Sequence, residues 1–154
     1  AEVPEKVYAT GYAHDKDIAA LNDFDTVLVT VHYPNGLMCS IDTSRISAYG
    51  YDQRLEVFGE HGMARAENQL NNTLQLSTAS GTNSSVANHS FPQRYKDAYM
   101  EELKQFVHGI ENGILNNVTK QECMLSHLIA DAALEAAVNN KVVDFKNDYG
   151  NKLS

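Results

Sequence analysis

The side chains best suited to binding a small ligand are concentrated in the stretch from Ser44 to Gly62. It carries two tyrosines, Tyr49 and Tyr51, with Gly50 between them. A phenol hydroxyl can both donate and accept a hydrogen bond, while its ring lines the wall of a pocket. Both tyrosines are therefore candidate ligand contacts. The alternative for Tyr51 is a half-buried ring at the end of a strand with no role in binding.

Three charged side chains lie close to these tyrosines, and each has two interpretations. Asp52 and Arg54 can orient a substrate or a subunit, or they can form a structural ion pair or cap a turn. Arg45 can reach a ligand or a cofactor, or it can be a solvated arginine on a strand. The structural alternative is favoured for all three, but we keep them as candidates. The candidate substrate-binding residues are Tyr51, Tyr49, Asp52, Arg54 and Arg45.

Other patterns in the sequence exclude several kinds of chemistry. There is no Gly-x-Gly-x-x-Gly fingerprint for a dinucleotide, no phosphate-binding P-loop and no Gly-x-Ser-x-Gly nucleophile elbow. The six histidines and two cysteines lack metal-ligand spacing. Twenty acidic and twelve basic residues give a formal charge of −8, which argues against a nucleic acid or an anionic membrane as partner. We therefore assign no catalytic, cofactor-binding or metal-binding residue to the chain.

The first half of the sequence alternates between apolar and polar residues, which predicts β-strands. Pro34-Asn35-Gly36 has the composition of a tight turn between two of them. The strand that starts at Val7 has bulky side chains on both faces, so we expect it to be covered on both sides. The polar stretches 15–25 and 79–90 are expected to be loops. The predicted strands are Val7–His14, Thr26–Tyr33, Leu37–Ile46, Arg54–Phe58, Met63–Ala66 and Thr73–Thr78.

The second half changes to the spacing of α-helices. Apolar residues recur every three or four positions from Pro92 to Ile110. Thr119 to Glu122 has the form of a capping box, which opens a second helix that ends near Asn139. A last short strand is predicted at Val142–Phe145. Strands followed by helices indicate a single α+β domain over residues 1–154, with an open, mainly antiparallel β-sheet and helices packed on one face.

Residues 49–62 follow the pattern Tyr-Gly-Tyr-Asp-x-Arg-x-Glu-Val-x-Gly-x-x-Gly. This pattern resembles a motif in the C-terminal domain of the glucose–fructose oxidoreductase / inositol dehydrogenase (Gfo/Idh/MocA) family. Further similar segments follow the family's order and cover nearly the whole chain. They are residues 23–27, 34–36, 94–106 and 130–137. Within this resemblance, Tyr51 matches a substrate contact of inositol-dehydrogenase-like members and is the strongest candidate. Tyr49 is a weaker candidate, because the residue next to it is equally able to be the one that points inward.

The resemblance implies a two-domain, NAD(P)-dependent oxidoreductase that acts on sugars, polyols and related alcohols. In this family an N-terminal Rossmann domain binds the nucleotide and carries the catalytic lysine of a Glu-Lys-Pro motif. The family's Asp-x-x-x-His pair lies just before the point where this chain starts. Glu5-Lys6 is not the lysine motif, since Val7 follows it. We therefore expect NAD or NADP to bind in the full-length parent, and this chain alone to bind no cofactor and to be inactive.

Three functions follow from these observations. The first is the substrate-binding and oligomerisation domain of an enzyme that carries out inositol 2-dehydrogenase-like hydride transfer. Its partners would be the missing Rossmann domain and a small polyol or sugar. The second is a non-enzymatic homo-oligomeric binding module that lacks the cofactor half. The third, an unrelated β-sheet interaction domain, is disfavoured by the ordered resemblance.

Two more expectations concern self-association and location. The sheet should expose Val, Leu and aromatic residues on the face opposite the helices, and copies should associate there in a two-fold arrangement. The first residues carry no basic-then-apolar signal segment, and no apolar run is long enough to span a membrane. We therefore expect a cytoplasmic protein.

Overall fold

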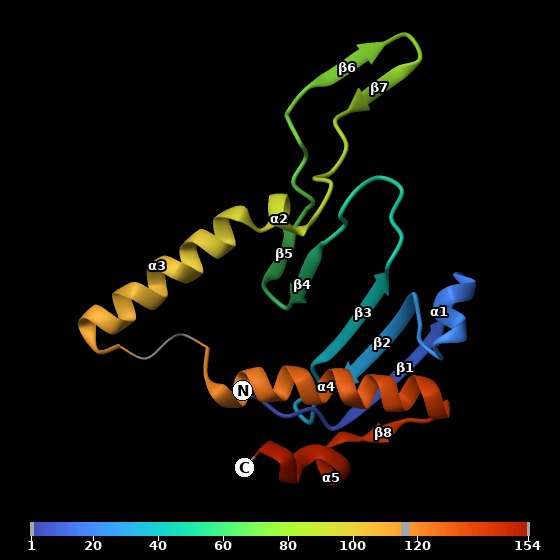
Figure 1. Cartoon of the computed structure of the whole chain (residues 1–154), viewed down its shortest axis with the longest axis vertical. Helices are drawn as coiled ribbons and strands as arrows, with labels where there is room; N and C mark the ends of the chain where they lie inside the picture. The colour runs from blue at the N-terminus through green and yellow to red at the C-terminus, as the bar shows by residue number, and fades with distance from the viewer. Residues whose placement is uncertain (1, 115–117, 154) are drawn as a thin grey trace. The chain divides into compact units, whose positions relative to one another are not determined.

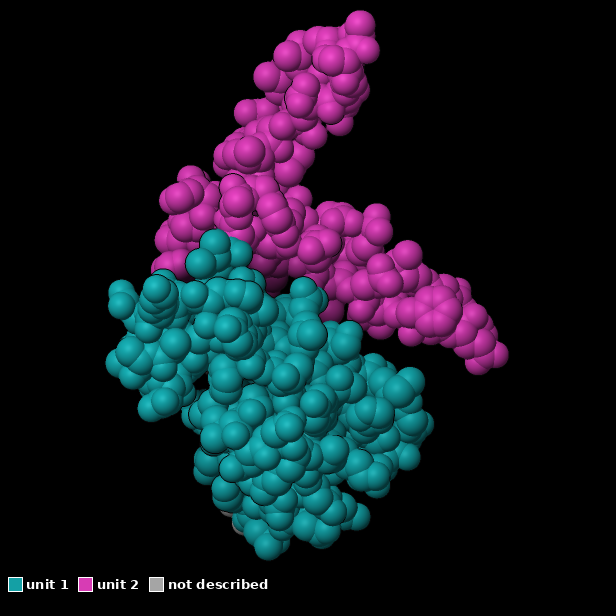
Figure 2. Space-filling model, turned by 90° about the vertical axis from the view of Figure 1, so that its right-hand side faces the viewer, with its two compact units in different colours: residues 1–46, 117–154 teal, residues 47–116 magenta. Residues whose placement is uncertain are grey.

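A computed structural model describes residues 2–114 and 118–153 of the chain (Figure 1). It contains two compact units, which Figure 2 shows in two colours. Unit 1 consists of residues 1–46 and 117–154, and unit 2 consists of residues 47–116. The architecture is α+β with antiparallel strands, as the sequence predicted. The single domain over residues 1–154 stays a prediction.

Unit 1 is built around a four-stranded antiparallel sheet with the strand order β3-β2-β1-β8. β2 is rich in Val and Thr, whose branched side chains fit a pleated surface. β1 and β2 pair over their full length, so that Val7 lies opposite Val31 and Ala9 opposite Val29. The strands are β1 (Lys6–Tyr12), β2 (Thr26–His32), β3 (Met38–Ser44) and β8 (Val143–Asp144).

The predicted turn at Pro34-Asn35-Gly36 joins β2 to β3. The Tyr33 N–H donates to the Leu37 carbonyl at 2.9 Å, and the Gly36 N–H donates to the Tyr33 carbonyl at 3.0 Å. The Leu37 N–H also donates to the side-chain oxygen of Asn35 at 2.9 Å. Gly36 has a φ of +89°, a conformation that side chains disfavour. The turn thus fixes the register in which β2 and β3 pair.

Helix α4 (Lys120–Asn139) covers one face of this sheet (Figure 1). The predicted capping box is formed, since the Glu122 N–H donates to the Thr119 hydroxyl at 3.2 Å and the Thr119 N–H donates to the Glu122 carboxylate at 2.8 Å. α4, the sheet and helix α5 (Phe145–Tyr149) share the core. The core residues are Val7, Ala9, Val31, Leu125, Leu128, Ala132, Ala133, Ala136, Val143, Phe145 and Tyr149.

The opposite face of the sheet is open among the described residues. Tyr8 and Tyr12 on β1 are 38% and 65% exposed, so the described residues of this chain cover the strand on one side, and its cover on the other side stays a prediction. Leu28 and Met38 are exposed as well. The expected exposed valines are not on this face, because alternation turns the valines of β1 and β2 toward α4. The open face therefore carries aromatic, Leu and Met side chains among Thr and Ser.

Unit 2 contains two β-hairpins and two helices, and it has almost no core of its own. In the part of unit 2 that the structure describes, Ala87 is the one buried side chain. An isolated two-stranded hairpin is marginally stable in water, so the two hairpins of unit 2 gain little stability from their own pairing. Its elements are β4 (Leu55–Gly59), β5 (Gly62–Ala66), β6 (Gln75–Thr78), β7 (Gly81–Ser84), α2 (Phe91–Arg94) and α3 (Lys96–Asn112).

Several short elements differ from the sequence-based expectation. Helix α1 (Lys16–Ala20) and strand β7 lie in stretches predicted as loops, and α5 with a 3₁₀ helix (Gly150–Leu153) follows the last strand. These elements have at most five residues, which is too short for a clear apolar period. The helix predicted from Pro92 is divided at Tyr95 into α2 and α3. No helix in the described ranges is both long and apolar enough to cross a membrane.

Candidate functional site

The chain around Tyr51 is fixed against the segment that precedes α2, within unit 2. The Tyr51 N–H donates to the Asn88 carbonyl at 2.8 Å, and the Asn88 N–H donates to the Gln69 carbonyl at 3.0 Å. Gly50 has a φ of +118°, and a Cβ atom added there would lie 2.8 Å from the Ala87 carbonyl oxygen. A side chain at Gly50 would therefore strain the backbone and push the two segments apart.

The carboxylate of Asp52 is the centre of a hydrogen-bond network in unit 2. One of its oxygens accepts from Arg54 Nε at 2.8 Å and from Asn68 Nδ2 at 2.7 Å. The other accepts from Arg54 Nη2 at 2.8 Å and from the Tyr49 hydroxyl at 2.5 Å. Arg54 first, then Tyr49 and Asn68, hold the pKa of the Asp52 carboxyl far below its usual range.

This network engages three of the predicted site residues with one another. Each carboxylate oxygen of Asp52 already accepts two hydrogen bonds, one of them from Arg54. Asn68 extends the network, because its side-chain oxygen accepts from the Gln53 N–H at 2.8 Å. The arrangement supports the structural interpretation of Asp52 and Arg54, and their role in binding a substrate stays a prediction.

Tyr51 is half-buried, and its hydroxyl is not among the groups that bind Asp52. Its ring meets the ring of Tyr95 edge to face, with 5.9 Å between the ring centres and 83° between the ring planes. Burial first, and then a side-chain hydrogen bond with the Tyr51 phenol, raise the pKa of Tyr95. Tyr51 thus has a supported ring and a hydroxyl outside the Asp52 network, which suits a ligand contact.

Arg45 belongs to unit 1, directly after β3, and its side chain is exposed. Its backbone N–H donates to the Asp25 carbonyl at 2.8 Å, next to a buried carboxylate. The Asp25 carboxylate accepts from the Asp15 N–H at 2.7 Å, and this bond is the main reason that its pKa is lowered. The backbone of Arg45 is therefore tied down, while a role of its side chain in binding stays a prediction.

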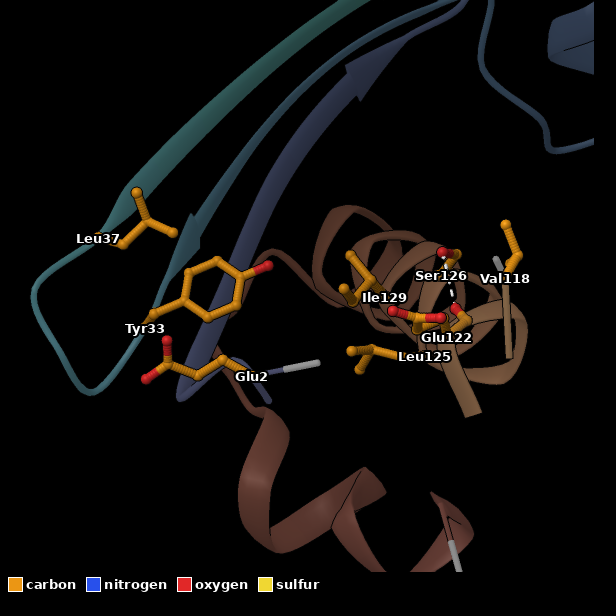
Figure 3. A pocket seen from close by; sticks show the side chains of 8 residues that line it. All are labelled: Glu2, Tyr33, Leu37, Val118, Glu122, Leu125, Ser126 and Ile129. Atoms are coloured by element: carbon orange, nitrogen blue, oxygen red, sulfur yellow. Dashed lines mark hydrogen bonds between the residues drawn. The ribbon is translucent and has the colours of Figure 1, made fainter. Parts of the chain in front are cut away.

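A separate hollow of about 500 Å³ lies in unit 1 between the β2–β3 turn and α4 (Figure 3). Two of its polar groups already serve the helix: Glu122 caps it, and the Ser126 hydroxyl donates to the Glu122 carbonyl at 3.0 Å. We therefore assign no binding role to this hollow. It is lined by Glu2, Tyr33, Leu37, Val118, Glu122, Leu125, Ser126 and Ile129.

Two residues of the candidate site were not identified as such from the sequence. Asn68 has no distinguishing pattern, since its role depends on a contact with Asp52 across sixteen positions. Tyr95 was noted only as part of a helical stripe and of the family resemblance. Within residues 2–114 and 118–153 no group of three or more His, Cys, Asp or Glu side chains is placed to hold a metal ion.

Comparisons with known proteins agree with the fold. A sequence model described as "Oxidoreductase family, C-terminal alpha/beta domain" matches residues 2–145. The chain is 33% identical to a myo-inositol 2-dehydrogenase of Thermotoga maritima over 150 residues, which is 97% of this chain and 45% of that protein. It is 27% identical to a scyllo-inositol 2-dehydrogenase (NAD(+)) of Bacillus subtilis over 129 residues, 82% of this chain and 37% of that protein.

A solved structure of a similar protein also matches most of this chain. The crystal structure of a myo-inositol dehydrogenase from Corynebacterium glutamicum superposes with a TM-score of 0.86 and 35% identity, covering 92% of this chain and 43% of that one. The chain thus spans less than half the length of each of these proteins.

Proposed function

Since the chain belongs to this oxidoreductase family, as its C-terminal alpha/beta domain, we propose that it is the substrate-binding and oligomerisation half of an NAD(P)-dependent dehydrogenase that acts on an inositol or a related polyol. The relatives that carry inositol in their names support this substrate class. The cofactor in the name of the Bacillus subtilis relative supports a nicotinamide nucleotide. The cytoplasmic location expected from the sequence stays a prediction.

The observation that carries the proposal is the arrangement of Tyr51. Its backbone is held by Asn88, its ring rests on Tyr95, and its hydroxyl lies outside the Asp52 network. A phenol held in this way can donate a hydrogen bond to one polyol hydroxyl or accept one from it. The role of Tyr51 is to bind and orient the substrate.

Hydride transfer needs a nicotinamide ring held against the substrate carbon. The residues present do not fit this cofactor, because the sequence has no glycine-rich phosphate-binding turn. We therefore assign no step of hydride transfer to this chain. On this proposal the nucleotide, the catalytic base and the choice between NAD and NADP belong to the other half of the parent protein.

The test is an assay of the full-length parent with NAD⁺ and NADP⁺ against myo-inositol, scyllo-inositol and glucose. We expect reduction of one nucleotide with at least one inositol, and a higher polyol KM in Tyr51→Phe with an unchanged nucleotide KM. Tyr49→Phe is the matched control, since its hydroxyl is already bound to Asp52. A parent that binds polyols but reduces neither nucleotide would instead be a non-enzymatic binding module.

A further inference from the structure

Tyr95 occupies a fixed position in the backbone of unit 2. It is the residue between α2 and α3, with φ of −107° and ψ of 12°. Its N–H donates to the Phe91 carbonyl at 2.9 Å, and its carbonyl accepts from the Tyr99 N–H at 2.9 Å. The Cα–Cβ direction of Tyr95 is therefore set by hydrogen bonds on both sides.

The Tyr95 ring is supported by neighbours of its own. The Tyr99 ring lies edge to face with it, with 6.3 Å between ring centres and 77° between ring planes. The guanidinium carbon of Arg94 lies 5.6 Å from the centre of the Tyr95 ring, within the range of a cation–π contact. Burial is the main cause that raises the pKa of Tyr95, so this phenol stays protonated and uncharged at neutral pH. Tyr95 is thus a rigid, neutral surface for the residue that packs on it.

Tyr51 packs on this surface through its ring, and its phenol shares a hydrogen bond with the Tyr95 phenol. Its hydrogen bond to Asn88 and the close approach at Gly50 hold the backbone, but they leave the side-chain torsions free. Among the described residues, Tyr95 is the one aromatic ring that contacts the Tyr51 ring. Tyr95 is therefore the neighbour that the structure shows in direct ring contact with Tyr51.

We propose that Tyr95 is a positioning residue, which sets the orientation of the Tyr51 ring and so aims the Tyr51 hydroxyl at one hydroxyl group of the polyol. The inference rests on the proposed function, because it takes Tyr51 as the substrate contact. Inositol isomers differ only in the directions of their hydroxyl groups, and a hydrogen bond weakens steeply as its angle departs from linear. An aimed phenol therefore discriminates between isomers, and a freely rotating one does not.

The test compares three variants of the full-length parent in steady-state kinetics. Tyr95→Leu removes the ring, Tyr95→Phe keeps the ring and removes the hydroxyl, and Tyr99→Leu is the matched control because its ring contacts Tyr95. We expect Tyr95→Leu to raise the polyol KM by about threefold to tenfold, the range of one edge-to-face pair, and to reduce the preference between inositol isomers. The nucleotide KM should stay unchanged. Tyr95→Phe keeps the ring contact and loses the hydrogen bond with the Tyr51 phenol, so it should raise the polyol KM less than Tyr95→Leu does.

Two kinetic results would overturn the inference. One is an unchanged polyol KM and isomer preference in a folded Tyr95→Leu protein. The other is an equal rise of the nucleotide and polyol KM in Tyr95→Leu and Tyr99→Leu, which would indicate general loosening around α3.

Fluorine NMR of fluorotyrosine-labelled protein separates this inference from the proposed function. The Tyr51 signal is assigned by its loss in Tyr51→Phe. A Tyr51 signal that becomes broadened or split in Tyr95→Leu but not in Tyr99→Leu, which the lost ring current alone does not cause, supports positioning even if Tyr51→Phe leaves the polyol KM unaltered and so removes the substrate role. A Tyr51 signal that stays single and sharp in Tyr95→Leu, even where it is shifted, contradicts positioning whatever the kinetics show.

Discussion

Arg54 donates from two nitrogens to the two carboxylate oxygens of Asp52, at 2.8 Å each, although only two positions separate the residues in the chain. Such a two-point contact has a planar geometry that other cations do not reproduce. It fixes the start of β4 to the end of the segment that carries Tyr49 and Tyr51. The structural ion pair that the sequence favoured for Asp52 and Arg54 is therefore formed, while a role of the pair in binding a substrate stays a prediction.

Replacing Asp52 tests this ion pair. Asp52→Asn removes the charge and turns one acceptor into a donor that faces Arg54, so we expect the free energy of unfolding to fall by about 1–2 kcal/mol. Chemical denaturation of the full-length protein measures this change. Glu60→Gln, an exposed carboxylate in the β4–β5 turn, is the control and should change stability by less than about 0.5 kcal/mol. Equal effects of both substitutions would show that the ion pair does not stabilise the fold.

The same carboxylate predicts how stability depends on pH. Its folded-state pKa lies below the ordinary value of 3.8, so its contribution is complete above that value and is lost as the pH falls through 3.8 toward the folded-state pKa. Unfolding measured between about pH 6 and pH 3 should show a smaller loss of stability in Asp52→Asn than in the wild type. Parallel pH curves for the two proteins would show that Asp52 is not responsible.

Gly50 offers a test of the close approach between its segment and Ala87. Gly50→Ala combines a strained φ of +118° with a Cβ atom 2.8 Å from a carbonyl oxygen. Gly36→Ala has comparable strain, at a φ of +89°, but no atom within 4 Å of the added Cβ. We expect Gly36→Ala to cost about 1 kcal/mol in unfolding free energy and Gly50→Ala at least about 1 kcal/mol more. Equal losses would show that the segments can separate without cost.

Self-association through the open face of the unit 1 sheet is the remaining expectation. Leu28 is 56% exposed on that face, and Leu28→Lys would place a charge in a contact between two copies. Leu21→Lys is the control, since Leu21 is exposed beside α1 and not on the sheet. Sedimentation velocity of the full-length protein should show a smaller oligomer in Leu28→Lys alone. A wild-type protein that is monomeric at about 50 µM, a concentration at which micromolar complexes form, would contradict it.

Local signals explain which parts of the fold were predictable. The β2–β3 turn and the capping box at Thr119 each satisfy their own backbone groups within a few residues, so their residue types reveal them. Whether β1 is buried on one face or on both faces could not be predicted from its own residues. Bulky residues such as Tyr8 and Tyr12 occur both in buried and in half-open strands, and only the position of α4 decides between these.

The candidate site was predictable in composition but not in function. The segment from Tyr49 to Arg54 gathers phenols and charges, and the structure brings two of them, Tyr49 and Arg54, to the carboxylate of Asp52. The sequence could not tell which of them are held in the Asp52 network and which are not. That division depends on Asn68 and Tyr95, which reach the segment only through the folded chain.

The arrangement of unit 1 has a consequence for folding during synthesis. Three of its four strands, β1, β2 and β3, end by Ser44, whereas α4, which covers the sheet, begins only at Lys120, and β8 follows α4. At a synthesis rate of about 5–20 residues per second, several seconds pass between the synthesis of β1 and β2 and the synthesis of α4. During that interval the valines of β1 and β2 are open to other chains. A nascent-chain chaperone should therefore protect this protein most strongly before Asn139 leaves the ribosome.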